Sequence, residues 1–360
     1  MKHFTDTLQQ RLANQLARPE YGPETVVIGG GTGLSTMLRG LKRYTHNLTA
    51  IVTVADNGGS SGMLREDLRM LPPGDIRNCI LALAETEPLM NELIRYRFAD
   101  GRLKGQNFGN LFLAALTSVT GNFYEAVCAF SQVLAITGRV LPVSLQDIQI
   151  SARLADGTVI RGESSIGERV PDQSNEIREI RMEPDDAEPM EEAVQAIDDA
   201  HVIVLGPGSL YTSVIPNLLF PGIRNAILRS NAPCIYVCNV MTQPAETCGY
   251  DAWRHVEALL RHVGRSETAG FLDCCIVNSN GPDLSAPLLA RYATEQSDPV
   301  GMAIQKLEQA GLEVVAAPMA VEDGDKIRHD SDLLARTVMA AAVECGRARR
   351  EEPVPDGVLA

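Results

Sequence analysis

Residues 25–35 read TVVIGGGTGLS, and this segment determines the class of structure to expect. A short run of β-branched residues stops abruptly at glycines, which is the pattern of a buried strand leading into a tight turn. A helical pattern follows in residues 35–44. Glycines let the backbone come close to a ligand, and a helix start offers unpaired N–H groups and a partial positive charge. The segment therefore predicts a phosphate seat, to which Thr32 and Ser35 would add hydroxyl donors.

This glycine turn matches neither of the two common nucleotide fingerprints. The dinucleotide pattern G-x-G-x-x-G requires a glycine where Leu34 stands, if Gly29 is its first member. The Walker loop requires G-K-[ST], which the turn lacks. Both an NAD-dependent dehydrogenase and a Walker-type hydrolase are therefore disfavoured. For this segment taken alone, a strand–helix turn without a ligand remains the alternative.

Continuous apolar runs that end at small or polar residues recur at residues 48–55, 201–205, 234–238, 274–277 and 314–317. Strands that are apolar at every position are covered by helices on both faces. Helical patterns lie between these runs, at residues 76–83, 87–97, 111–119, 123–134, 191–200, 250–263 and 302–310. This alternation predicts an α/β fold with a Rossmann-like, doubly wound and mainly parallel sheet. Residues 140–182 interrupt it and predict a small β excursion, with a hairpin turn at Asp156-Gly157.

The chain is predicted to have three parts. Apolar residues at helical spacing between Phe4 and Leu16 indicate a helical extension in residues 1–22. Residues 23–345 are expected to form a single α/β domain. The segment 346–360 is charged and then contains Pro and Gly, which is typical of a flexible tail.

Composition excludes several classes of partner. The net charge of -14 argues against a broad surface for nucleic-acid phosphates, and the aromatic share of 5% argues against base stacking. No apolar run is long enough for a membrane span, and residues 1–18 do not resemble a signal peptide. Most of the eight cysteines lie inside apolar runs, which is typical of buried thiols in a reducing compartment. These observations predict a cytoplasmic protein.

Two further segments repeat the pattern of a strand followed by small polar residues. Residues 56–62 read DNGGSSG, in which Asp56 could accept a hydrogen bond from a ribose, hold Mg²⁺ or position a substrate hydroxyl. The alternative is a flexible surface turn. Residues 206–213 read GPGSLYTS and repeat the logic of the first loop. Ligands of open α/β sheets bind at the carboxyl ends of the strands, so both glycine turns are expected to face one crevice.

Other polar segments allow a structural or a functional interpretation. Asp75 in PPGDIRN is placed to cap a helix, whereas Arg77 at a helix start suggests pairing with an anion. Asn110 in FGNLF could be a cap or could read a base or sugar edge. Residues 239–243 (NVMTQ) and 325–330 (DKIRHD) are further candidates, the latter being either a phosphate contact or a solvated loop. The six histidines show no metal-ligand spacing.

The ordered set GGGTGLS, ADNGGSSG, PPGDIRN, FGNLF, GPGSLYTS, NVMTQ and IRHD resembles the gluconeogenesis factor family, also called the YvcK type. Its superfamily includes CofD, the 2-phospho-L-lactate transferase. The resemblance extends from Val26 to Asp330. It implies a CofD-like fold and a cytoplasmic regulator that binds UDP-sugars, notably UDP-N-acetylglucosamine, and is needed for cell shape and wall synthesis during gluconeogenic growth.

Carried over position by position, the resemblance implies a set of ligand contacts: Gly30, Gly31, Thr32, Gly33, Asp56, Asn57, Ser60, Asn110, Gly208, Ser209, Leu210 and Arg328. His329 matches the same late motif as Arg328. Asp56 is the one catalytic candidate, and no residue is assigned to a metal. The implied partners are a cell-envelope synthesis protein and further copies of the chain.

Two functions remain open at this point. The first is a binding regulator that requires no cofactor. The second is a CofD-like transferase that uses a nucleotide-activated donor, and only this function would call for Mg²⁺. Phosphoryl-type transfer needs neutralising charge at the reacting phosphate, and the glycine loops contain no lysine. This absence favours binding over catalysis.

Overall fold

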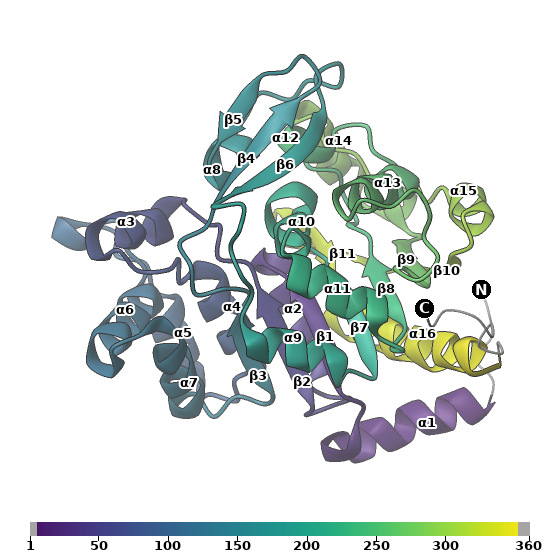
Figure 1. Cartoon of the computed structure of the whole chain (residues 1–360), viewed down its shortest axis with the longest axis horizontal. Coiled ribbons are helices and arrows are strands. Elements are labelled where there is room, and N and C mark those ends of the chain that lie inside the picture. The colour runs from purple at the N-terminus through teal and green to yellow at the C-terminus, as the bar shows by residue number, and fades with distance from the viewer. Residues whose placement is uncertain (1–5, 352–360) are drawn as a thin grey trace.

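The computed structural model describes residues 6–351, and its centre is a seven-stranded sheet (Figure 1). The strand order is β10-β9-β8-β7-β1-β2-β3, and every neighbouring pair is parallel. From β1 the chain adds β2 and β3 toward one edge of the sheet, and from β7 it adds β8, β9 and β10 toward the other edge. This change of direction between β1 and β7 is typical of a doubly wound fold. The strands are β1 (Thr25–Gly29), β2 (Leu48–Val52), β3 (Arg139–Pro142), β7 (Val202–Leu205), β8 (Cys234–Val237), β9 (Cys274–Asn278) and β10 (Glu313–Ala317).

Helices cover both faces of this sheet, which confirms the predicted α/β class. β1, β2, β7, β8 and β9 are buried at every residue. The α-helices are α1 (Asp6–Ala17), α2 (Gly31–Leu41), α3 (Gly59–Leu68), α4 (Gly74–Leu83), α5 (Pro88–Arg95), α6 (Phe108–Thr120), α7 (Phe123–Val133), α8 (Glu163–Gly167), α9 (Glu191–Asp198), α10 (Ile215–Leu218), α11 (Pro221–Arg229), α12 (Pro244–Thr247), α13 (Ala252–His262), α14 (Ala286–Thr294), α15 (Ile304–Gln309) and α16 (Ser331–Glu351). Between β7 and α10 lies a π-helical turn, η3 (Leu210–Val214).

The two faces are covered by different groups of helices. α2 packs between α4 and α16, and α16 also contacts β8, β9 and β10. On the opposite face α9 packs against α11, and α10 contacts β1 and α13. α9, α10 and α11 are seen in front of the sheet in Figure 1. Among the described residues no single helix is long and apolar enough to cross a membrane, and α6 and α7 meet that test only as a pair bent by 119°.

The β excursion is smaller than the sequence predicted. β3 lies inside the predicted range 140–182 but pairs in parallel with β2, so it is the edge strand of the central sheet. A short edge strand ending in Pro142 carries little of the apolar pattern of the inner strands. The excursion itself is an antiparallel sheet of order β5-β4-β6, made of β4 (Gln149–Leu154), β5 (Val159–Arg161) and β6 (Ile177–Glu183). The predicted turn at Asp156-Gly157 joins β4 to β5.

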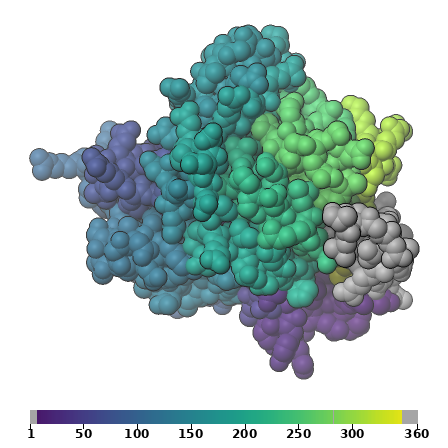
Figure 2. Space-filling view, in the orientation of Figure 1, coloured from purple at the N-terminus to yellow at the C-terminus, as the bar shows by residue number. Residues whose placement is uncertain are grey.

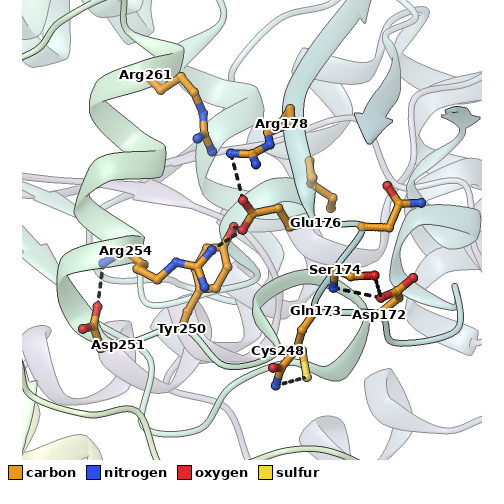
Figure 3. Close-up of polar contacts among 12 residues, drawn as sticks. Asp172, Gln173, Ser174, Glu176, Arg178, Cys248, Tyr250, Asp251, Arg254 and Arg261 are labelled. Carbon is orange, nitrogen blue, oxygen red and sulfur yellow. Dashed lines mark hydrogen bonds and ion pairs between the residues drawn. The ribbon is translucent and has the colours of Figure 1, made fainter. Parts of the chain in front are cut away.

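The excursion forms one end of the molecule, at the top of Figures 1 and 2. A cluster of charged and aromatic side chains fixes its β6 end to α13 (Figure 3). Glu176 pairs with Arg254 of α13 and with Arg178, whose Nη1 lies 2.8 Å from its carboxylate. The Arg254 guanidinium stacks over the Tyr250 ring at 4.1 Å. Because Glu176 is mostly buried, at 15% side-chain exposure, this cluster holds the small sheet in one position.

The first and last described helices, α1 and α16, pack against each other. α1 buries Leu8 and Leu12 and contacts α16, whereas Phe4 lies outside the described residues. The predicted tail begins at residue 346. α16 continues to Glu351, and residues 352–360 lie outside the described part of the chain.

Candidate functional site

The two glycine loops meet at the carboxyl ends of β1 and β7, where the order of the strands reverses. Ile28 and Leu205 are paired across these strands. A methyl group added at Gly33 would lie 2.7 Å from the Pro207 carbonyl oxygen, and one at Gly208 would lie 3.0 Å from the Gly30 oxygen. Such separations leave no room for a side chain, so glycine at these positions allows the loops to touch.

The first loop presents the start of α2 to this junction. Gly31 adopts a φ of +70°, which favours glycine. The N-cap residue Gly30 has no capping side chain and the first turn holds no acidic residue, but the buried Asp75 carboxyl accepts a hydrogen bond from the Gly31 amide. The N–H groups of that turn, with the positive end of the helix dipole, make a natural anion seat.

The second loop is held in place by two amide side chains. Asn239 Nδ2 donates to the Gly208 oxygen at 2.8 Å, and the Gly208 amide donates to Asn239 Oδ1 at 3.2 Å. Gln243 Nε2 donates to Ser209 Oγ at 2.7 Å. The segment after β8, which sequence analysis had marked as a candidate, thus fixes the conformation of the second loop.

A cavity of about 390 Å³ opens between these elements, and we call it the loop cavity. Its lining combines the two loops, the segment after β8, α14 and the end of β12 (Lys326–His329). The polar and aromatic members of this lining are Thr32, Thr36, Ser209, Asn239, Thr242, Gln243, Tyr292, Glu295, Ser297, Arg328 and His329. Arg328 is the only lysine or arginine in this described lining, and its Nε lies 3.1 Å from Asp323 Oδ2.

A second cavity of about 490 Å³, the acid cavity, adjoins the first. Both cavities are lined by Ser209, Gln243 and Pro244, so they are neighbouring parts of one cleft. The other walls of the acid cavity come from Gly58, α8, η3 and α12. α8 belongs to the β excursion, which therefore supplies one wall of the candidate site.

Three carboxyl groups line the acid cavity, Glu163, Glu168 and Glu246, and Asp56 and Asp75 lie close enough to influence Glu163. Burial and, secondly, the nearby Asp56 carboxylate raise the pKa of Asp75 to about 6. The same two causes raise the pKa of Glu163 to about 8. Burial also raises the pKa of Glu246, although Glu246 accepts hydrogen bonds from the Tyr211 amide and Thr212 Oγ1, each at 2.8 Å. Burial, and secondly the like charges around Asp75 and Glu163, therefore disfavour ionisation of these carboxyls.

About half of the ligand contacts that the family resemblance implies lie at the loop cavity. Six of them belong to its lining: Gly31, Thr32, Gly33, Gly208, Ser209 and Arg328. Gly30 directly precedes α2, and its backbone oxygen lies next to Gly208. Leu210 is fully buried and belongs to the described lining of neither cavity.

Asn57, Ser60 and Asn110 connect structural elements beside the cavities. Asn57 Oδ1 accepts hydrogen bonds from Ser164 N at 2.9 Å and Ser164 Oγ at 2.8 Å, which fixes α8 over the loop after β2. Asn110 Nδ2 donates to Ser60 Oγ at 3.1 Å, and both side chains are buried between α3 and α6. Neither Ser60 nor Asn110 belongs to the described lining of the two cavities.

Several other candidates have local partners. Arg77 donates to Asn110 Oδ1 and Asn78 Oδ1, each at 2.8 Å, and burial lowers its pKa to about 10. Asp330 accepts from the Asp332 and Leu333 amides at the start of α16, as a helix cap does. His329 Nε2 lies 3.3 Å from the Cys238 oxygen, and burial lowers its pKa to about 4, so the ring is neutral.

Sequence analysis missed the walls that come from outside the glycine motifs. Glu163 and Arg169 of the acid cavity lie in the excursion, and Tyr292 of the loop cavity lies on α14. Glu163 follows Gly162 at the end of β5, but that strand belongs to the antiparallel excursion and not to the parallel sheet whose strand ends predicted the site.

Comparison with known proteins identifies the family. The profile described as 2-phospho-L-lactate transferase CofD matches residues 25–320. A putative gluconeogenesis factor of Thermoanaerobacterium thermosulfurigenes is 54% identical over 318 residues, covering 88% of this chain and 96% of the relative. The gluconeogenesis factor of Bacillus subtilis is 44% identical over 314 residues, with coverage of 87% and 96%.

The chain belongs to the CofD family and, within it, to the gluconeogenesis factors. A crystal structure of a Bacillus halodurans protein is similar to this fold with a TM-score of 0.83 and 44% sequence identity, covering 88% of this chain and 99% of the other. A second structure, described as a member of the UPF0052 family from the same organism, gives a TM-score of 0.82. The matched residues include both glycine loops and the lining of the acid cavity, and they end before Ile327, Arg328 and His329 of the loop cavity.

Proposed function

We propose that this gluconeogenesis factor binds a nucleotide sugar of the UDP-N-acetylglucosamine type in the loop cavity and acts as a regulator in the cytoplasm. The contact between Gly33 and Pro207 carries this proposal, because it joins two glycine loops into one seat. The amides of Thr32 and Gly33 in the first turn of α2 and a single arginine, Arg328, would together offset the charge of a diphosphate.

The biological role that we propose follows from the family. Binding of the nucleotide sugar would change how the protein interacts with a cell-envelope synthesis protein, and would thereby support cell shape and wall synthesis during gluconeogenic growth. The family name of the relatives supports a link to gluconeogenesis. Differential contacts of the ligand with two states of the protein would provide the coupling.

A CofD-like transferase is the second candidate function, and the carboxyl groups behind the first loop favour it. A methyl group at Gly30 would lie 2.7 Å from Asp75 Oδ2, and one at Gly74 would lie 3.1 Å from Asp56 Oδ2, so both carboxyls lie close to the loop region. One or two carboxylates with substrate phosphates are a common ligand set for Mg²⁺. Asp56 and Asp75 would hold the ion, which would offset charge at the transferred phosphate.

Isothermal titration distinguishes the two functions. We expect UDP-N-acetylglucosamine to bind in the presence of EDTA, and Thr32→Ala and Asp56→Ala to weaken this binding. Thr32 is exposed at the cavity, so its substitution should leave the melting temperature unchanged. An absence of heat with any UDP-sugar, together with Mg²⁺-dependent turnover of a nucleotide-activated donor, would favour the transferase.

A further inference from the structure

The acid cavity differs in charge from the loop cavity that it adjoins. The described lining of the loop cavity holds one carboxyl, Glu295, and one arginine, Arg328, which pairs with Asp323. Its helix-start amides suit an anion. The acid cavity is lined by Glu163, Glu168 and Glu246, with Asp56 and Asp75 close by. A second phosphate or carboxylate entering it would be repelled, so the cavity suits an uncharged group that carries hydroxyl or amide functions.

The one basic residue in the acid cavity's described lining is already engaged. Arg169 donates through Nε to the Ala245 oxygen and through Nη1 to the Asn175 oxygen at 3.1 Å. It thereby ties the segment after α8 to α12. Its partners are uncharged backbone oxygens, so Arg169 keeps its charge, which favours the ionised form of Glu246.

Glu163 is the carboxyl of this cavity that is both partly buried and available to a ligand, whereas Glu168 is exposed to solvent. Glu246 is buried, and each of its carboxyl oxygens already accepts a hydrogen bond, from the Tyr211 amide and from Thr212 Oγ1. Glu163 is partly buried at the cavity wall, and its carboxyl makes no hydrogen bond or ion pair with any residue in the described range 6–351. With a pKa raised to about 8 by burial and the Asp56 carboxylate, it is protonated at neutral pH. A protonated carboxyl both donates and accepts, which matches the hydroxyl and amide groups of a sugar.

We propose that the acid cavity receives the glycosyl group of the nucleotide sugar and that Glu163 is its specificity-determining contact. This inference rests on the proposed function. Ser209 and Gln243 line both cavities, so a diphosphate held by the loops would place its sugar at the boundary. The volume of about 490 Å³ lies in the range of small-molecule sites and accommodates a hexosamine. The β excursion would then act as a sugar-recognition element, because it carries α8.

The position of Glu163 also predicts how sugar recognition depends on pH. Five charged groups face or surround its carboxyl, namely Asp56, Asp75, Glu168, Arg169 and Glu246. A bound sugar would exclude water from Glu163 and would disfavour its ionised form further. The sugar's contribution to affinity should therefore be full below pH 7 and should be lost as the pH rises through about 8.

The test compares UDP with UDP-N-acetylglucosamine on the full chain by isothermal titration. The ratio of the two dissociation constants isolates the sugar's contribution. Glu163→Ala should reduce this ratio on the order of tenfold, the equivalent of one lost hydrogen bond to a buried group, while UDP itself binds as before. Glu163→Gln stays neutral and keeps a donor and an acceptor. It should retain the ratio and make it independent of pH.

The outcomes separate this inference from the proposed function. An unchanged ratio in Glu163→Ala, with UDP still bound, overturns the sugar-site assignment alone. Failure of UDP to bind the wild-type protein refutes the nucleotide site and both proposals. If Glu163→Ala does not fold, the pH profiles decide. A wild-type ratio that falls above about pH 8 beside a flat Glu163→Gln ratio supports the inference, and two flat profiles overturn it.

Discussion

Substitution of Gly33 by alanine tests whether contact between the two loops builds the site. Gly33 lies in the first turn of α2 with a backbone conformation that any residue adopts. Helix propensity alone would make Gly33→Ala stabilising by about 0.5–1 kcal/mol. The tertiary contact predicts the opposite sign, because the added methyl group would lie 2.7 Å from the Pro207 oxygen and 2.9 Å from its carbonyl carbon.

The size of the effect follows from the displacement that the methyl group demands. Ordinary contact begins near 3.4 Å, so the second loop must retreat by roughly 0.7 Å. Pro207 is backbone-restricted and Gly208 is clamped by Asn239 at 2.8 and 3.2 Å, so the loop does not move freely. Overpacking of this kind costs about 1–3 kcal/mol. Separation of the loops should also weaken UDP binding by on the order of tenfold or more.

Urea denaturation and isothermal titration measure the two effects, with Gly167→Ala as the stability control. Gly167 is also a helical glycine without positive φ, but a methyl group there meets nothing within 4 Å. We expect this control to be neutral or slightly stabilising. If Gly33→Ala is as stable as the wild-type protein and binds UDP equally well, the two loops do not form a joint seat.

Three further predictions follow from the same geometry. Asn239→Ala removes both hydrogen bonds to Gly208 and should cost about 1–2 kcal/mol in unfolding free energy, with weaker UDP binding; unchanged affinity would contradict the role of the clamp. Asp75→Asn removes a carboxyl whose pKa is raised to about 6, mainly by burial. The raised folded pKa means that the wild-type protein loses stability as the pH rises through about 4 to 6, so the variant should gain up to about 3 kcal/mol relative to wild type between these limits in urea denaturation. A parallel pH dependence of the two proteins would show that Asp75 is not destabilised. Glu176→Ala leaves Arg178 and Arg254 without their shared carboxylate and should speed hydrogen exchange in β4, β5 and β6, while exchange in β1 and β7 stays the same.

The central sheet was predictable because its inner strands are short runs of apolar residues that end at glycine or asparagine. β3 was not, since four residues with an exposed Arg139 and a terminal Pro142 look like part of the excursion. α3 was hidden for a different reason. It begins with Gly59, Ser60, Ser61 and Gly62, which are weak helix formers. Tertiary contacts to α6 through Ser60 stabilise it, and a propensity pattern cannot show those contacts.

The site was predictable to the extent that it lies on strand ends. Parallel topology brings the ends of β1 and β7 together, so the pairing of Gly33 with Pro207 could be anticipated as one crevice. Glu163 could not be, because its place at the cleft depends on the hydrogen bonds from Ser164 to Asn57 and on the Glu176 cluster that fixes the excursion. Ser60 and Asn110 were predicted as ligand contacts because they belong to polar motifs. In the structure they instead connect α3 to α6 through a hydrogen bond.

A crystal structure of the protein with UDP-N-acetylglucosamine in the presence of EDTA tests the central claim most directly. We predict that the diphosphate lies against the amides of residues 31–33 and against Ser209, with Arg328 beside it and the glycosyl group next to Glu163. A diphosphate bound away from both glycine loops would contradict the two-loop seat. So would a second crystal, grown with Mg²⁺ in place of EDTA, in which the diphosphate is held solely by a metal ion on Asp56 and Asp75.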